Sequence, residues 1–121
     1  METVVDPKLE AKQRNRRRSM RRKARTSVKV QCRKGAYGLG PNIAGSILDL
    51  ADSGVRLIVT APLNISGDVE VLITGYGLRQ TIKRLGYVRW QLKLENGDFC
   101  TGIEFQKRID YRDWQNLSSP N

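Results

Sequence analysis

Apolar and polar residues alternate along the body of the chain, and this period of two is typical of half-buried β-strands. The clearest run is "YVRWQLKLE", residues 87–95, in which every second residue is apolar, beginning with Val88. The run "DFCTGIEFQ", residues 98–106, alternates in the same way. Because the apolar face of each strand should pack inward, we assign Trp90 and Phe105 to the core.

Four further segments carry a similar pattern or a continuous apolar stretch, and we predict them as strands too. They cover residues 28–33, 43–50, 55–60 and 68–75. Turn signals separate several strands: "ADSG" precedes residue 55, and Asn96-Gly97 is a strong hairpin signal. We expect Gly54, the last residue of "ADSG", to supply the positive φ that a tight turn needs.

The C-terminal segment "IDYRDWQNL", residues 109–117, has the spacing of a short helix with Asp110 as its N-cap. Ile109, Trp114 and Leu117 would share one helical face. Strands that close on themselves remove the exposed edges that an open sheet leaves. We therefore predict an all-β fold, a small six-stranded antiparallel β-barrel with a short C-terminal helix over one side or opening.

The chain of 121 residues lacks histidine, the commonest general base and a frequent metal ligand. Its two cysteines, Cys32 and Cys100, are too few for a disulfide framework or a zinc cluster. We therefore expect no catalytic residue, no metal and no cofactor, and hence no enzyme. No apolar run reaches the roughly 20 residues of a membrane helix, and no secretory signal is visible, so we expect a cytoplasmic protein.

The net charge of +10 is concentrated near the N-terminus. Residues 1–25 carry ten Lys and Arg against three Asp and Glu, whereas residues 26–121 carry twelve against nine. A basic arm on a nearly balanced body indicates an anionic partner. We divide the chain into a flexible basic arm at residues 1–20, a barrel domain at residues 21–117 and a tail at residues 118–121.

Four short sequences follow one another before the predicted helix: "RRKAR" at 21–25, "DLADSG" at 49–54, "GYVRW" at 86–90 and "GIEF" at 102–105. Their order and spacing resemble the PilZ domain, the bacterial receptor module for the second messenger cyclic di-GMP. The resemblance covers roughly residues 21–117. It implies a non-catalytic receptor or adaptor that binds this nucleotide and acts through contact with another protein, on motility, adhesion or exopolysaccharide production.

The resemblance implies ligand contacts at two motifs, RxxxR and [DN]xSxxG. Arg21 and Arg25 match the first motif. Asp49 and Gly54 match the second, in which Ala51 replaces the serine. Losing one neutral hydrogen bond costs about 1 kcal/mol, or roughly fivefold in affinity. The absent hydroxyl therefore weakens such a site without excluding it.

These residue types suit a cyclic dinucleotide. The guanidinium groups of Arg21 and Arg25 can bind a phosphate or the O6 and N7 acceptors of a guanine. Phosphates repel Asp49, whose suitable partner is the N1 and N2 donor edge of a guanine. Because Asp49 and Ala51 share a strand parity, we expect both to point out of the barrel toward the ligand. Gly54 would let the backbone turn or come close to it.

Simpler roles stay open for several residues. Arg22 and Arg18 could hold phosphates or only face solvent. Asp49 could cap the "ADSG" turn through its own side chain. Tyr37 and Tyr76 sit beside glycines and could stack on a base or be ordinary surface residues.

We expect ligand binding to draw the basic arm from disorder onto the barrel and so to change the surface shown to a protein partner. Two alternatives stay open. The barrel could be a degenerate interaction module that binds no nucleotide, which Ala51 favours. It could also be a small β-barrel nucleic-acid-binding protein, although few aromatic residues are available for base stacking and the body is only weakly basic.

Overall fold

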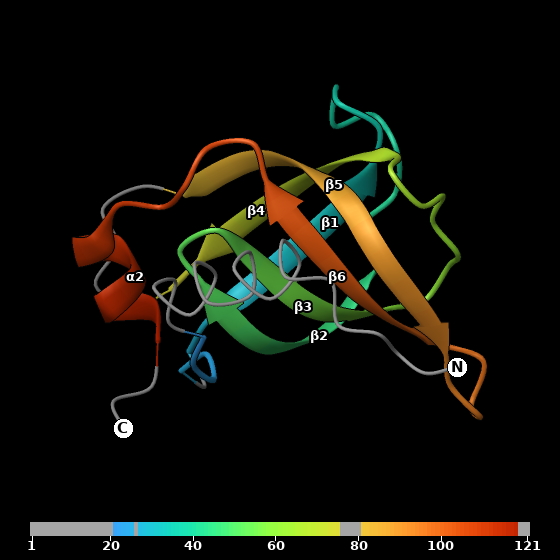
Figure 1. Cartoon of the computed structure of the whole chain (residues 1–121), viewed down its shortest axis with the longest axis horizontal. Helices are drawn as coiled ribbons and strands as arrows, with labels where there is room; N and C mark the ends of the chain where they lie inside the picture. Colours follow the sequence, from blue (N-terminus) through green and yellow to red (C-terminus); the bar gives the residue numbers. More distant parts are fainter. Residues whose placement is uncertain (1–20, 26, 76–80, 119–121) are drawn as a thin grey trace, which may run out of the picture.

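The computed structural model describes residues 21–25, 27–75 and 81–118 of the chain. Six strands and one short helix make up this part of the protein (Figure 1). They are β1 Lys29–Lys34, β2 Ala44–Ala51, β3 Gly54–Val59, β4 Asp68–Thr74, β5 Ile82–Lys93, β6 Phe99–Phe105 and α2 Tyr111–Leu117. All six predicted strands are confirmed, although β5 begins at Ile82, earlier than its alternating pattern indicated.

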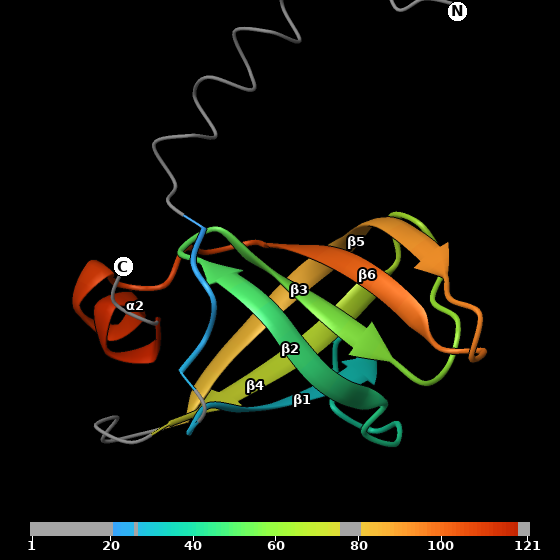
Figure 2. The ribbon, with the colours of Figure 1, turned by 90° about the horizontal axis from the view of Figure 1, so that it is seen from below.

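The strands form one antiparallel sheet in the order β1-β4-β5-β6-β3-β2, and the sheet curls so that its two edge strands approach each other (Figure 2). At this seam the Ile43 N–H donates to the Cys32 carbonyl at 2.9 Å. Asn42 braces the same point, because its Oδ1 accepts hydrogen bonds from the N–H groups of Cys32 and Ala44. The sheet is therefore a curled half-barrel, and the predicted all-β class with six antiparallel strands is confirmed.

The core lies inside the curl of the sheet and is closed at one end by α2 (Figure 1). Ile109, Trp114 and Leu117 are all buried there, so the predicted apolar helix face is confirmed. Asp110 occupies the N-cap position, as predicted, but its side chain makes no capping hydrogen bond. Packing against the barrel, rather than capping, therefore holds this short helix in place.

Residues 21–25, which we call the strap, run beside the end of β2 toward α2 (Figure 2). Arg22 and Leu50 exchange two backbone hydrogen bonds, with N···O distances of 3.0 and 2.7 Å. Further along, the Arg25 N–H donates to the Leu117 carbonyl at 2.8 Å. The strap therefore connects the edge of the sheet with the last turn of the helix.

Trp90 lies on the outside of the barrel, so its predicted place in the core is wrong. Val88 pairs with Ile103 and Trp90 pairs with Gly102, which leaves Arg89 as an extra residue on β5. This β-bulge shifts the alternation by one position. Val88 is consequently buried while Trp90 is 40% exposed. The assignment of Phe105 to the core is confirmed.

Gly54 is needed for a different reason from the one predicted. Positive φ angles occur among the described glycines at Gly35, Gly38 and Gly97, but not at Gly54. Instead, a Cβ at Gly54 would lie only 2.3 Å from the carbonyl oxygen of Ile103 on β6. The close approach of β6 therefore excludes a side chain at this position, which the sequence around the turn did not indicate. The positive φ of Gly97 confirms the predicted Asn96-Gly97 turn.

We expect Gly54→Ala to lower the free energy of unfolding by about 1–3 kcal/mol, because the added methyl group forces β3 and β6 apart. For a chain of this size the loss corresponds to a decrease in Tm of roughly 5–15 °C. Thermal unfolding followed by circular dichroism measures it. Gly40→Ala is the matched control, since the nearest atom to its Cβ would be 3.8 Å away. Equal Tm values for the two variants would contradict the steric explanation.

Within the described ranges, no helix has the length and apolar character needed to cross a membrane. The same residues contain no group of His, Cys, Asp or Glu side chains that could hold a metal ion. Both cysteines are free thiols. Burial raises the pKa of the Cys32 thiol to about 11, so this thiol stays protonated at neutral pH.

Candidate functional site

Asp49 on β2 lies directly opposite Arg56 on β3. The "ADSG" turn dictates this pairing, because Ala51 pairs with Gly54 and, from Ala51 back to Asp49, each step along β2 advances one step along β3. Leu50, the neighbour of Asp49, points into the core, so strand alternation places the Asp49 side chain on the outer face. Two opposite charges therefore face each other across adjacent strands on the outside of the barrel.

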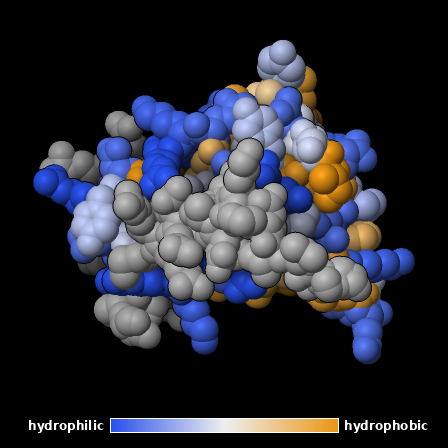
Figure 3. Space-filling model, viewed as in Figure 1, coloured by the Kyte–Doolittle hydropathy of each residue, from blue (hydrophilic) through white to orange (hydrophobic). Residues whose placement is uncertain are grey.

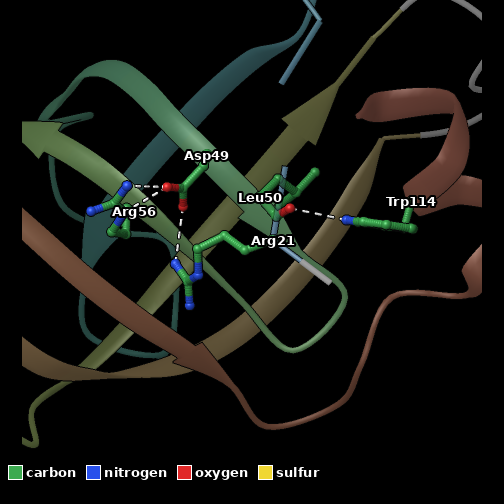
Figure 4. Close-up of polar contacts among 5 residues, drawn as sticks. All are labelled: Arg21, Asp49, Leu50, Arg56 and Trp114. Atoms are coloured by element: carbon green, nitrogen blue, oxygen red, sulfur yellow. Dashed lines mark hydrogen bonds and ion pairs between the residues drawn. The ribbon is translucent and has the colours of Figure 1, made fainter. Parts of the chain in front are cut away.

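The Asp49 carboxylate is bound by two arginines, one at each oxygen (Figure 4). Arg21, from the strap, donates through Nη1 to Oδ1 at 3.0 Å. Arg56 donates to Oδ2 through Nε at 2.6 Å and also through Nη2. We call these three residues the Asp49 cluster. It joins a position of the RxxxR motif to a position of the [DN]xSxxG motif.

Burial makes the contacts of the Asp49 cluster important. Only 8% of the Asp49 side chain is exposed, so its carboxylate depends on hydrogen-bonded cations rather than on water. The side chains of Arg21 and Arg56 are 46% and 42% exposed. The hydrogen bond to Asp49 raises the pKa of Arg56 above its ordinary value. Two cations and one anion give the cluster a net positive charge at the surface, which suits an anionic ligand.

The strap directs its arginines to alternate sides, as an extended chain does. Arg21 and Arg25 are exposed, whereas Arg22 between them is half-buried. The Arg22 guanidinium lies 4.8 Å from the centre of the Trp114 ring, a cation–π distance. The Trp114 indole N–H in turn donates to the Leu50 carbonyl at 3.0 Å (Figure 4). The structure therefore brings Arg21 to Asp49 and holds Arg22 against α2.

Ala51 and Gly54 form the next outward pair of the β2–β3 hairpin. Ala51 has the same strand parity as Asp49, as predicted. The residue is nevertheless only 1% exposed, so this outward position is covered. Ala51 and Gly54 therefore contribute backbone atoms and a methyl group to this part of the hairpin, but no polar side chain.

A row of outward positions continues from the Asp49 cluster across the sheet. Arg56 is in register with Gly102 on β6, and Gly102 is in register with Trp90 on β5. A Cβ at Gly102 would lie 2.3 Å from the Trp90 Nε1, so the indole ring lies directly over this glycine. An exposed aromatic ring therefore lies two strands away from Arg56, on the same face.

Arg56 and Trp90 are the residues of this surface that the sequence interpretation missed. The signal for Arg56 was present, because counting outward from the "ADSG" turn pairs it with Asp49. The signal for Trp90 was hidden by the bulge at Arg89, which no alternating pattern reveals.

Tyr37 lies in the loop between β1 and β2. This loop is at the end of the barrel away from α2 (Figures 1 and 2). Tyr37 is strongly exposed there. On the face seen in Figure 3, the visible hydrophobic side chains also gather mainly away from α2, among hydrophilic ones. The other two candidates, Arg18 and Tyr76, lie outside the described residues.

Comparison with known protein families gives a match that covers most of the chain. The PilZ domain family matches residues 15–119, which is most of the chain and includes every residue of the Asp49 cluster. A comparison with curated proteins finds no match. Since the match extends over far more than half of the chain and the fold agrees with it, the protein belongs to the PilZ domain family.

Proposed function

We propose that this protein is a receptor for cyclic di-GMP that binds the nucleotide on the outer face of β2 and β3, beside the strap. PilZ domains are receptor and adaptor modules for this nucleotide rather than enzymes. The observation that carries the proposal is the 3.0 Å contact between Arg21 and Asp49. It joins the two ligand motifs, which lie 28 residues apart in the sequence, at one half-exposed surface.

The charges of the site suit the two kinds of group that the ligand presents. Arg21 and Arg25 lie on the exposed side of the strap, where their guanidinium groups can bind phosphates or the O6 and N7 atoms of guanine. Asp49 is an acceptor only and therefore suits the N1 and N2 donors of a guanine. Ala51 and Gly54 would line the site without adding charge. Arg22 contacts Trp114, so we give it a supporting role rather than a ligand contact.

Trp90 provides a flat apolar surface on which a guanine can stack, and we expect Trp90→Ala to weaken cyclic di-GMP binding about tenfold. Stacking of a base on an aromatic ring contributes about 1–3 kcal/mol. A calorimetric titration measures the change. Leu92→Ala is the control, because Leu92 is an exposed apolar residue of the same strand. If both variants bind like the unaltered protein, Trp90 lies outside the ligand surface.

The basic arm at residues 1–20 lies outside the described residues, and its ordering on the ligand is part of the proposal. The strap itself is already bound to the barrel by backbone hydrogen bonds at Leu50 and Leu117. We therefore propose that binding orders only residues before Arg21, including Arg18. The rearranged surface would then act on a protein partner in the cytoplasm, without catalysis.

A degenerate module that binds no nucleotide is the second candidate. The buried Ala51 in place of a serine favours it, and so does the pairing of both Asp49 oxygens within the protein. The two candidates differ in one measurement, a titration with cyclic di-GMP and with GMP as the control. Saturable binding of the cyclic dinucleotide alone supports the receptor, and no binding supports the degenerate module.

A further inference from the structure

The two oxygens of the Asp49 carboxylate are held very differently. Oδ1 accepts from one nitrogen of Arg21, which reaches it from the strap. Oδ2 accepts from two nitrogens of Arg56, which lies directly opposite Asp49 on β3. Figure 4 shows the carboxylate between the two guanidinium groups. Arg21 therefore makes one hydrogen bond to Asp49 from a peripheral segment, whereas Arg56 makes two hydrogen bonds to it within the sheet.

We infer that Arg56 is a positioning residue that keeps Asp49 in place for guanine recognition, while Arg21 is an exchangeable partner that the ligand replaces. The inference rests on the proposed function, because it assigns roles within the same site. It concerns Arg56, which neither ligand motif includes.

Burial explains why two arginines are needed. An ionised carboxylate that is 8% exposed cannot lose all its partners without a large penalty. If Arg21 were the only partner, moving its guanidinium to a phosphate would leave the carboxylate buried and unpaired. Arg56 removes that penalty, because it stays on Oδ2 while Oδ1 is released. The freed Oδ1 can then accept from the N1–H and N2–H donors of a guanine.

The position of Arg56 makes it a fixed partner. β3 lies between β2 and β6, so the Arg56 backbone is paired on both sides, with Asp49 and with Gly102. Its Nε and Nη2 both donate to the same oxygen, which sets the direction of the carboxylate. A lysine would supply the charge but not this fork of donors. The role therefore depends on the guanidinium shape as well as on its charge.

The inference predicts an effect on base selectivity. Cyclic di-AMP has the same phosphates as cyclic di-GMP, but its adenine N1 is an acceptor and cannot donate to Asp49. Arg21 and Arg25 would contribute to both nucleotides through the phosphates. Adenine still has the N6 amino donor, but its N1 acceptor repels a carboxylate, so the Asp49–Arg56 pair would contribute more to the guanine nucleotide than to the adenine nucleotide. Removing Arg56 should therefore reduce the affinity for cyclic di-GMP more than the affinity for cyclic di-AMP, to which the phosphate contacts still contribute.

The experiment compares the affinities of the full chain for cyclic di-GMP and cyclic di-AMP by calorimetry. We expect Arg56→Ala to weaken cyclic di-GMP binding about tenfold or more, as the loss of hydrogen bonds to a charged group does, while cyclic di-AMP binding changes less than about threefold. Arg56→Lys should recover only part of the loss. Arg89→Ala is the matched control, because this arginine pairs with Glu104 on the same sheet. An equal loss for both nucleotides, or an unchanged ratio, would overturn the inference.

A second measurement tests the anchoring of Asp49 by Arg56 without any nucleotide. Because Arg56 donates through Nε and Arg21 through Nη1, the Arg56 Nε–H should exchange slowly with water in NMR spectra of the free protein. It should stay slow in Arg21→Ala and become fast in Asp49→Asn. Fast exchange in the unaltered protein would overturn the role of Arg56. Slow exchange together with no binding of cyclic di-GMP would support the anchoring of Asp49 by Arg56 but contradict the proposed function and, with it, the role in guanine recognition.

Discussion

Replacing Arg21 and Arg25 together by alanine is expected to reduce the affinity for cyclic di-GMP by at least about 100-fold. Each hydrogen bond to a charged group contributes about 1.5–3 kcal/mol, so losing two or more removes at least about 3 kcal/mol of binding free energy. Both side chains are exposed on one side of the strap, whose backbone bonds do not depend on them. Isothermal titration calorimetry at physiological salt measures the change.

A matched control separates this effect from a general loss of positive charge. Lys34→Ala combined with Lys93→Ala removes the same charge from exposed positions at the ends of β1 and β5, at the end of the barrel away from α2 (Figure 1). We expect this variant to bind within about twofold of the unaltered protein, because exposed charges beyond a Debye length are screened. Equal losses in the two double variants would mean that nonspecific attraction governs binding. In the Arg21→Ala, Arg25→Ala variant Asp49 still has Arg56 as a partner, so the Tm of this variant should change little.

Trp114→Ala is expected to have the largest effect on stability, a loss of about 3–5 kcal/mol in the free energy of unfolding. Trp114 is buried between α2 and the barrel, and its N–H donates to the Leu50 carbonyl at 3.0 Å. The Trp114 ring also makes a cation–π contact with the guanidinium of Arg22. Truncation therefore leaves a cavity and loosens the strap together with the helix. Thermal unfolding should show a Tm lowered by roughly 10–25 °C.

Two further variants show which part of Trp114 matters. Tyr111→Ala removes a ring of the same helix that contacts Trp114, with the ring centres 5.7 Å apart, but is itself 60% exposed, so it should change the Tm by only a few degrees. Trp114→Phe keeps an aromatic ring but lacks the N–H, so it should lose an intermediate amount. A Tm for Trp114→Ala as high as that of Tyr111→Ala would contradict the place of this residue in the core.

Most of the fold could be predicted because its signals are local. The alternating runs, the Asn96-Gly97 turn and the apolar face of residues 109–117 each depend on neighbours in the sequence, and each is confirmed. The predictions that were wrong concern positions whose environment is set by tertiary structure. The bulge at Arg89 turned Trp90 outward, and the approach of β6 decided why residue 54 is a glycine. No local pattern contains that information.

The candidate site divides in the same way. The motif positions Arg21 and Asp49 were recognised from the sequence, and the structure brings them into contact. Arg56 was within reach of sequence reasoning, since it follows from counting across a two-residue turn. The pairing of the strap with Leu117 could not be foreseen, because it joins segments from opposite ends of the chain. Together with the two backbone hydrogen bonds between Arg22 and Leu50, this pairing holds the strap in place beside Asp49.

The most direct test of the receptor function is a calorimetric titration of the unaltered protein with cyclic di-GMP at physiological salt, with GMP and a short single-stranded DNA as comparison ligands. The proposal predicts saturable binding of cyclic di-GMP with a Kd of about 1 μM or lower, and no measurable binding of GMP. A nucleic-acid-binding protein would instead bind the DNA and lose that affinity steeply with salt. No heat of binding with cyclic di-GMP, from a protein whose thermal unfolding shows it to be folded, would contradict the proposal.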